Sequence, residues 1–315
     1  MAQTTFPNAA SSNRFVPAGR ANAVSFAGVS RNFGSTRALD DVSFDIPVGS
    51  TVALLGPNGA GKSTAINVML GLLRTNGGNA RTLGLEPKQA VLAGRVGAML
   101  QSGGLPSGCL VRELVDFARG LYPNPLPLDD VLRTAGLTTL AGRRIESLSG
   151  GETQRLRFAI AIAGDPDLVF LDEPTVAMDV ESRHAFWNDM RRYTAEGRTV
   201  LFATHYLEEA DQVADRIIVL DHGRVAADGT PGAIKSAASS RTVRFRTPRP
   251  NDVALSGLPG VIGVEVRGES VTLDCSDADA AVAALYRLGV PVGDLEVTGA
   301  DLESAFLAIT AGERD

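Results

Sequence analysis

An eight-residue stretch, GPNGAGKS at positions 56–63, constrains the fold of this chain more than any other feature. It fits the pattern G-x-x-x-x-G-K-[ST] and stands between an apolar run, TVALL, and a segment with helical spacing, TAINVMLGLL. Gly59 and Gly61 permit backbone conformations that other residues resist. The amide N–H groups of residues 59–63 can then converge on an anion at the positive end of a helix dipole. Strand, loop and helix in this order predict a phosphate-binding α/β fold.

The last residues of this loop indicate which phosphates it holds. Lys62 is placed to reach β- and γ-phosphates, and the Ser63 hydroxyl is placed to ligate Mg²⁺. A glycine-rich turn without a ligand is the alternative, and the flanking strand and helix disfavour it. The predicted nucleotide-binding residues are Gly56, Pro57, Asn58, Gly59, Ala60, Gly61, Lys62, Ser63 and Thr64.

An acidic pair ends a second apolar run, LVFLDEP at 168–174. A buried parallel strand would deliver Asp172 to its carboxyl end, where ligands of such sheets bind. Asp172 is predicted to hold Mg²⁺, mostly through water. Glu173 is predicted to polarise an attacking water, and a positioned general base contributes about 10²–10⁴-fold. In isolation this pair would fit a simple cap before Pro174, but here it follows a phosphate loop in the same chain.

A second glycine pair, in SLSGGETQR at 147–155, precedes another predicted helix. It offers a second anion-binding helix N-terminus. One bound nucleotide needs only one phosphate-recognising loop, and this chain has two. The sequence therefore predicts a dimer with shared sites, in which the 149–151 loop of one subunit closes on the nucleotide held by the other.

Short apolar runs alternate with amphipathic segments from residue 24 to about residue 236, which predicts a mainly parallel sheet layered with helices. The early runs VSFAGV and VSFDIPV suggest an antiparallel flap. KSAASSR, at 235–241, is small and polar and is typical of a linker. The following strands and helices resemble a β-α-β-β-α-β unit, whose first helix has little support, with an added helix at 301–310.

Composition excludes several classes of protein. The net charge of −6 argues against a nucleic-acid binder that relies on a positive field, so no nucleic-acid partner is expected. The apolar runs are too short for a membrane span, which needs about 18 residues. Cys109 and Cys275 are far apart in sequence and show no metal-ligand spacing, so two ordinary thiols are expected.

The ordered motifs resemble those of the ATP-binding subunits of ABC transporters. GPNGAGKST resembles the Walker A loop, LSGGETQ the signature motif and VFLDEP the Walker B strand. The resemblance implies an α/β P-loop NTPase cassette with a mainly parallel sheet, an antiparallel β flap and a helical subdomain. It covers about residues 22–236, leaving a disordered tail at 1–21 and a small α+β domain at 237–315. ATP and Mg²⁺ are the implied cofactors.

The resemblance also assigns roles to single residues. Gln101 stands at the Q-loop, where it would sense Mg²⁺ and water, although a lone Gln after a strand is usually an ordinary loop residue. His205 stands at the switch position, where it would contact the γ-phosphate, and Asp179 stands at the D-loop. Phe33 matches the aromatic position that stacks on adenine, and a core phenylalanine is the competing interpretation. His184 and His222 match no motif and are expected to be structural.

Two positions depart from the family pattern. Glu152 replaces the usual signature Gln, while Ser149, Gly150 and Gly151 are intact, so the contact with the phosphates of the other subunit should survive. Met178 stands in a D-loop that usually reads small-Gly-Leu-Asp, and it could alter dimer packing.

As in the family, ATP binding would close a head-to-tail dimer, and the cycle would drive a separate membrane permease docked on residues 95–121. The protein would then lie on the cytoplasmic face of the membrane. The stretches AMLQSGGL and LESAFLAIT resemble subunits of the daunorubicin-resistance exporter type, which export drugs, lipids or polymers. An importer ATPase shares the catalytic set. A soluble switch on the ribosome or DNA is disfavoured by the single cassette and acidic charge, and a P-loop kinase or GTPase by LSGGETQ and His205.

Overall fold

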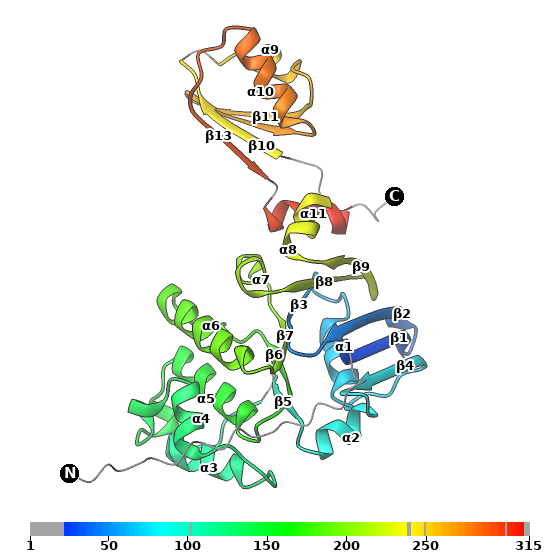
Figure 1. Cartoon of the computed structure of the whole chain (residues 1–315), viewed down its shortest axis with the longest axis vertical. Helices are drawn as coiled ribbons and strands as arrows, with labels where there is room; N and C mark the ends of the chain where they lie inside the picture. Colours follow the sequence, from blue (N-terminus) through cyan, green and yellow to red (C-terminus); the bar gives the residue numbers. More distant parts are fainter. Residues whose placement is uncertain (1–21, 101–102, 238–240, 249, 300, 312–315) are drawn as a thin grey trace, which may run out of the picture.

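The central element of the structure, a computed structural model, is a six-stranded sheet in the order β5–β6–β7–β3–β8–β9 (Figure 1). The structure describes residues 22–100, 103–237, 241–248, 250–299 and 301–311. Neighbouring strands run parallel from β5 to β8, and β9 is antiparallel to β8. The predicted mainly parallel sheet is confirmed. Its strands are β3 (Thr51–Leu55), β5 (Val96–Met99), β6 (Leu168–Asp172), β7 (Thr199–Ala203), β8 (Arg216–Asp221) and β9 (Arg224–Gly229).

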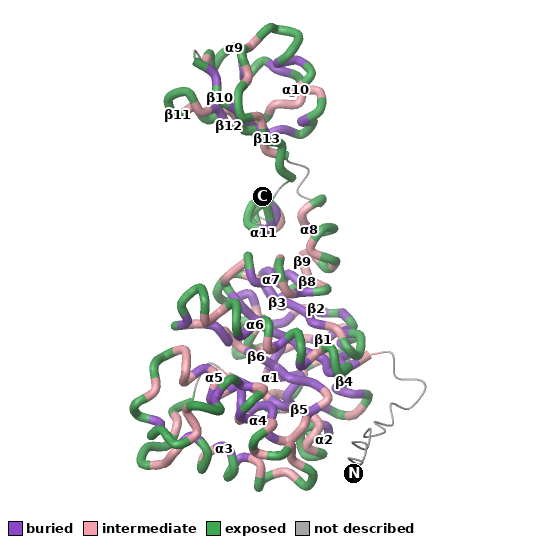
Figure 2. Tube along the Cα trace, turned by 60° about the vertical axis from the view of Figure 1, so that its left-hand side comes forward, coloured by how far each residue is buried: buried purple, intermediate pink, exposed green. Residues whose placement is uncertain are grey.

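Both faces of this sheet are covered, which is why its strands are continuous apolar runs. Successive side chains of a strand point to opposite faces. Val52 and Leu54 pack with the flap and α1 (Lys62–Met69), whereas Ala53 and Leu55 pack with α5 (Gly150–Ile162) and α6 (Val180–Ala195). Figure 2 shows the buried residues concentrated along these strands. The sheet therefore holds the loops at its strand ends on a rigid base.

The predicted flap is a three-stranded antiparallel sheet, ordered β2–β1–β4. It contains β1 (Asn22–Phe33), β2 (Thr36–Pro47) and β4 (Gly77–Thr82). The sequence predicts β1 and β2, although both are longer than expected. It does not predict β4, because GGNART lacks an apolar run, and this strand forms by pairing with the edge of β1.

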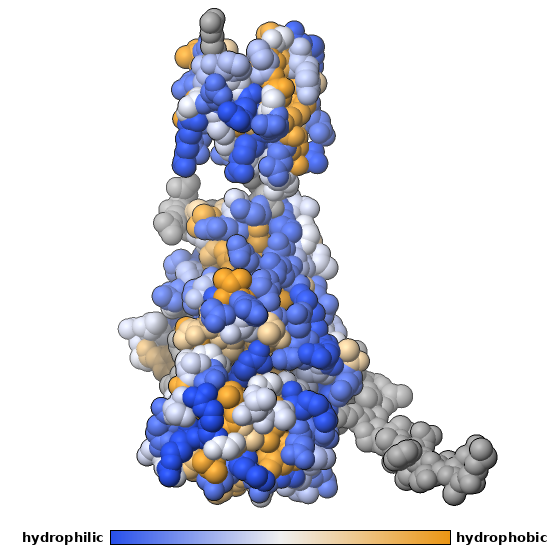
Figure 3. Space-filling view, turned by 90° about the vertical axis from the view of Figure 1, so that its left-hand side faces the viewer, coloured by the Kyte–Doolittle hydropathy of each residue, from blue (hydrophilic) through white to orange (hydrophobic). Residues whose placement is uncertain are grey.

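Helices α3 (Val111–Arg119) and α4 (Leu128–Thr134) pack against each other and against α5, and together they form the predicted helical subdomain. The face of the molecule drawn in Figure 3 carries small hydrophobic patches within a mostly hydrophilic surface. Within the described residues, no helix has the length and apolar character needed to cross a bilayer. The elements of the first domain not yet named are α2 (Pro87–Leu92), the 3₁₀ turns Thr138–Leu140 and Ile145–Ser147, α7 (Leu207–Val213) and α8 (Pro231–Ala237).

The C-terminal domain has the predicted β-α-β-β-α-β order and its own hydrophobic core, which includes Phe245, Leu273 and Leu285. Its antiparallel sheet has the order β11–β12–β10–β13. The weakly supported first helix is present but has only 5 residues. The elements are β10 (Arg241–Arg246), α9 (Asp252–Ser256), β11 (Val261–Arg267), β12 (Ser270–Cys275), α10 (Ala278–Arg287) and β13 (Gly293–Gly299).

The last helix, α11 (Leu302–Ala311), differs from the expectation. The sequence predicts a C-terminal domain at 237–315 that includes this helix. In the structure, α11 packs against α7, α8 and β9 of the first domain (Figure 1). Leu302 and Ala305 are buried in the cluster that contains α5 and α6, and Phe306 and Ile309 pack against it. The spacing of these residues makes one apolar stripe, which the surface of α7 and α8 covers.

Two predicted boundaries also move. The helix after the phosphate loop was expected to run to residue 73, but α1 ends at Met69 because Gly71 adopts φ = 68° and closes the helix. Helix α8 occupies the first part of the predicted linker at 235–241. The predicted disordered tail, residues 1–21, lies outside the described residues.

Candidate functional site

Three neighbouring strands bring the predicted site residues to one edge of the central sheet. Strand β7 lies between β6 and β3, and Ala203 at its end is level with Asp172 of β6 and Leu54 of β3. The loop at 56–62 follows β3, Glu173 follows β6, and the segment with His205 follows β7. Because all three strands run parallel, their carboxyl ends meet, as in other α/β sites.

The loop at 56–62 is held open by its glycines. Gly61 has φ = 105°, and a Cβ atom there would lie 2.5 Å from the carbonyl oxygen of Ala38. A Cβ on Gly56 would lie 2.3 Å from the carbonyl oxygen of Leu220. Neither position has room for a side chain, so the backbone itself forms the surface of the loop. A backbone cradle with free amides is what a phosphate group requires.

Lys62 lies inside this loop, at the start of α1. Its ammonium donates to the carbonyl oxygens of Gly56 at 2.6 Å and Pro57 at 3.0 Å. Burial lowers the pKa of Lys62, and the nearby carboxylates of Glu173 and Asp172 oppose that shift. One cation and two acids thus share the site. A cavity of about 570 Å³ lies beside the loop, lined by Pro57, Asn58, Gly59, Ala60, Asp221, His222 and Thr310.

Glu173 and His205 form a direct pair. The Nδ1 atom of His205 lies 2.7 Å from Oε2 of Glu173. The Glu173 side chain is 13% exposed, whereas that of His205 is 59% exposed. Glu173 has φ = 51°, an unfavourable backbone conformation for a non-glycine residue, and its N–H donates to the carbonyl of Ala203 at 2.9 Å. Such strain costs about 1–3 kcal/mol and is typical of functional sites.

Two of the three predicted Mg²⁺ ligands lie within the described residues. Ser63 lies in the first turn of α1 and Asp172 ends β6. Both fit a cation that takes few protein oxygens and completes its shell with water and phosphate. The described residues contain no group of three or more His, Cys, Asp or Glu that could hold a metal. Gln101, the third predicted ligand, lies outside the described residues.

The glycine pair at 150–151 begins α5, as predicted. Ser149 is the N-cap of this helix, and its hydroxyl accepts from the N–H of Glu152 at 3.2 Å. The Glu152 carboxylate accepts from the N–H of Ser149 at 2.7 Å and pairs with Arg143 at 3.0 Å. This arrangement is a capping box, which either Glu or Gln can complete. The departure at position 152 therefore keeps the local structure of the loop.

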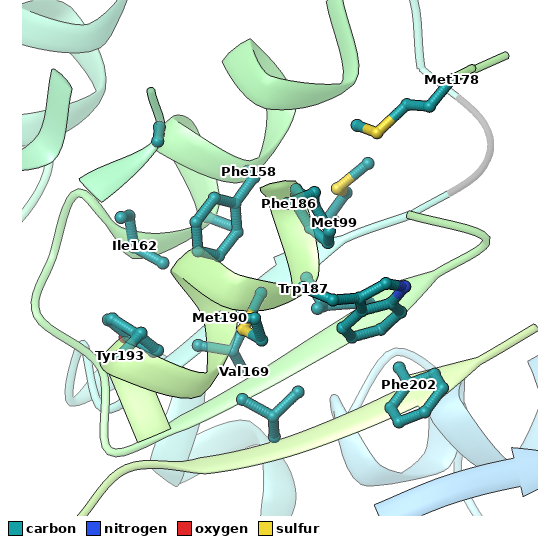
Figure 4. Close-up of a cluster of buried hydrophobic side chains, with 14 of the residues drawn as sticks. Met99, Phe158, Ile162, Val169, Met178, Phe186, Trp187, Met190, Tyr193 and Phe202 are labelled. Carbon is teal, nitrogen blue, oxygen red and sulfur yellow. The ribbon is translucent and has the colours of Figure 1, made fainter. Parts of the chain in front are cut away.

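The second departure is explained by packing. Met178 is buried in the hydrophobic cluster that also holds Trp187 and Phe158 (Figure 4). The next residue, Asp179, is the N-cap of α6 and accepts from the N–H of Ser182 at 2.7 Å. That hydrogen bond holds the pKa of Asp179 below its usual value. Asp179 thus orders the start of α6.

Phe33 lies at the end of β1 and is 47% exposed. The competing interpretation as a core phenylalanine therefore does not hold. The guanidinium of Arg31 lies 4.8 Å from the centre of its ring. An exposed ring is available for stacking, and its role toward a nucleotide stays a prediction.

Several residues around the site were not singled out in the sequence. Arg143 pairs with Glu152, and Glu209 is a buried acid that contacts both Thr175 and Thr204. The S-x-x-E pattern at 149–152 could have indicated the capping box. Glu209 follows another glutamate, and nothing in the sequence says which of the two faces the core.

Comparison with known proteins agrees with the motifs. A family model described as ABC transporter matches residues 39–176. The daunorubicin/doxorubicin resistance ATP-binding protein DrrA of Streptomyces peucetius is 33% identical, over 93% of this chain and 94% of that protein. The Nod factor export ATP-binding protein I of Rhizobium leguminosarum bv. viciae is 36% identical, over 93% of this chain and 96% of that protein.

Solved structures share this fold over about two thirds of the chain. A structure of an ATP-binding subunit of an ABC transporter matches with a TM-score of 0.62 and 27% identity, covering 68% of this chain and 92% of the other. A dimeric bacterial ABC transporter cassette matches with a TM-score of 0.58 and 25% identity, covering 66% of this chain and 98% of the other.

Proposed function

The chain belongs to the ABC transporter family as an ATP-binding, ATP-hydrolysing subunit, and from that premise we propose that it powers export through a separate membrane permease. The observation that carries the catalytic part is the 2.7 Å pair of Glu173 and His205 beside the phosphate loop. Glu173 accepts the proton of the attacking water. His205 orients that carboxylate and contacts the γ-phosphate.

The phosphate loop binds ATP through its backbone amides and through Lys62. The Lys62 ammonium, which lies against the Gly56 carbonyl, is within reach of the β- and γ-phosphates once they occupy the loop. Ser63, Asp172 and Gln101 would hold Mg²⁺, which would supply positive charge to the phosphates. Phe33 stacks on the adenine.

Two copies of the chain complete each site. The loop containing Ser149, Gly150 and Gly151 presents the N-terminus of α5 to the γ-phosphate held by the other copy. Asp179 lies in the same contact region, since a Cβ on Gly150 would lie 2.9 Å from Cβ of Ala177 in the D-loop. Closure of the dimer is the step that ATP binding favours, and hydrolysis reverses it.

The names of the relatives support export. DrrA is named for drug resistance and the Rhizobium protein for export of the Nod factor. The permease docks on residues 95–121, where α3 exposes Phe117 and the chain beyond it exposes Leu121. The protein lies on the cytoplasmic face of the membrane, held there by this contact.

The catalytic roles are tested by two substitutions. Glu173→Gln keeps the size of the side chain but removes the base, so we expect turnover to fall about 10²–10⁴-fold with ATP still bound. Lys62→Ala should weaken ATP binding itself. Both are measured by phosphate release and equilibrium nucleotide binding. Wild-type turnover in Glu173→Gln would contradict the assignment of the base, and full ATP affinity in Lys62→Ala would contradict that of the loop.

The partner is tested by affinity purification of Glu173→Gln from its native cells with Mg-ATP in mild detergent. We expect a polytopic membrane protein to co-purify, because the closed state persists when hydrolysis is blocked. Recovery of ribosomes or DNA-repair proteins instead would move the chain to the soluble ATPases. Inside-out vesicles that contain the complex then separate export from import, since ATP added outside should drive an exported cargo into the lumen.

A further inference from the structure

Glu209 is a buried acid in α7, four residues beyond the predicted switch histidine. It is 4% exposed, whereas its neighbour Glu208 is exposed. Burial raises the pKa of Glu209, and hydrogen bonds to its carboxylate oppose that shift. A buried carboxyl group is retained only where hydrogen-bond partners replace its lost water. Its partners therefore indicate what it does.

The two oxygens of Glu209 join two catalytic loops. The hydroxyl of Thr175 donates to Oε1, and the hydroxyl of Thr204 donates to Oε2 at 3.1 Å. Both threonines are buried. Thr175 is two residues beyond Glu173, and Thr204 immediately precedes His205. One carboxylate thus fixes the distance between the two segments that carry the Glu173–His205 pair.

A third segment joins the same carboxylate through Arg183 of α6. Nε of Arg183 lies 3.3 Å from Oε1 of Glu209, and the guanidinium lies 4.3 Å from the centre of the Tyr206 ring. One of its terminal nitrogens also lies 3.5 Å from the carbonyl oxygen of Met178 in the D-loop. The N–H of Tyr206 donates to the Thr204 hydroxyl at 3.0 Å, which closes the network.

We propose that Glu209 is a positioning residue that holds the Glu173–His205 pair in register with the D-loop. The inference rests on the proposed roles of Glu173 and His205. The backbone of Glu173 is in the left-handed region, and such a conformation persists only when its surroundings hold it. Through Thr175, Glu209 anchors the chain just beyond that residue. Through Arg183, it ties the same anchor to the segment that lies at the dimer contact.

The test is Glu209→Gln in the full-length chain, with Glu208→Gln as the matched control. The amide fills the same space but offers only one acceptor to the two threonines and no charge to Arg183. We expect kcat to fall about 10- to 100-fold, because small displacements of reacting groups cost that much. ATP affinity should stay within about twofold, because ligand-binding interactions in the loop are not touched. Glu208→Gln should match the wild type.

A merely structural role would lower the thermal midpoint of Glu209→Gln and leave kcat per folded molecule unchanged, and that result would overturn the proposal. Thr175→Val and Thr204→Val provide a second test if Glu209→Gln does not fold. Thr175→Val removes one hydrogen bond, to Glu209, and Thr204→Val removes two, the one to Glu209 and the one from the N–H of Tyr206. Glu209 remains in both variants, and Thr→Ser at the same position restores the hydroxyl. We expect kcat to fall in the Val variants and to recover in the Ser variants. Equal kcat in both would also overturn it.

Glu173→Gln is measured in parallel to distinguish an error in the proposed general base from an error in the proposed role of Glu209. If Glu173→Gln keeps wild-type turnover, the proposed general base is wrong. If Glu173→Gln loses turnover while the variants at positions 209, 175 and 204 keep it, the catalytic assignment stands and the positioning role of Glu209 is wrong.

Discussion

Glu152 places a negative charge at the start of α5, the helix end that is predicted to face phosphates. That charge has two local partners, the N–H of Ser149 and the guanidinium of Arg143. Glu152 thus contributes mainly to the start of the helix. The positive end of the α5 dipole and the N–H groups of Gly150 and Gly151 are left for an anion.

Substitutions at this position separate capping from charge. Glu152→Gln preserves the reciprocal cap and loses only an exposed ion pair, so we expect a change of less than about 1 kcal/mol in stability. Glu152→Ala removes half of the capping box and should cost about 0.3–1.5 kcal/mol. Calorimetric thermal unfolding measures both. Equal midpoints for Ala and Gln would show that the capping box does not stabilise the first domain.

Phe33 tests whether an exposed ring serves the nucleotide. Base–aromatic stacking contributes about 1–3 kcal/mol. Phe33→Ala should therefore raise the KM for ATP about fivefold or more, with little effect on stability, because the ring is half exposed. Phe33→Tyr keeps a stacking face and serves as the control. An unchanged KM in Phe33→Ala would leave Phe33 without a part in ATP binding.

At the scale of elements, helix α11 connects the two domains of the chain. It follows β13 of the C-terminal domain, yet its apolar stripe is buried against the first domain. Thr310, near its end, lines the cavity beside the phosphate loop. After the C-terminal domain, the chain therefore returns to the first domain through the docking of this helix.

The docking of α11 is tested with two leucines of the same helix. Leu302 is 3% exposed and Leu307 is 58% exposed. Leu302→Ala should destabilise the docked helix by about 2–5 kcal/mol, whereas Leu307→Ala should be nearly neutral. Hydrogen exchange of the α7 and α8 amides reports the effect locally. Equal exchange in the two variants would show that α11 is not held by this contact.

Helix α11 also shows which features of the fold the sequence could not predict. Apolar spacing predicted that residues 301–310 are helical, but spacing cannot say which surface covers the stripe. Motif order located the loop at 56–62, the acids at 172–173 and His205, because each follows a buried parallel strand that is visible as an apolar run. Strand β4 and the partners of Glu209 were not predictable, because both depend on contacts between segments far apart in the sequence.

At the scale of the whole molecule, the predicted catalytic unit is a pair of chains. The chain carries one phosphate loop and one α5 N-terminus, and each predicted site combines the loop of one copy with the helix end of the other. One of the solved structures of similar fold is a dimeric bacterial ABC transporter cassette. Dimerisation should therefore depend on ATP and on the glycines of the 149–151 loop.

Gly151 offers a clean test of that dependence. The atom nearest to a Cβ at this position would be Cγ of Met178, at 3.4 Å, which is ordinary van der Waals contact, so Gly151→Ala fits within its own subunit. In the other copy's site the same methyl group would stand between the α5 amides and the γ-phosphate. In the Glu173→Gln background with Mg-ATP, we expect sedimentation analysis to find dimers, and we expect Gly151→Ala to reduce them at least about tenfold while ATP still binds the monomer. Dimers that survive this substitution unchanged would place the trans contact elsewhere. A Glu173→Gln chain that stays monomeric with ATP would mean that the permease is needed to bring the two copies together.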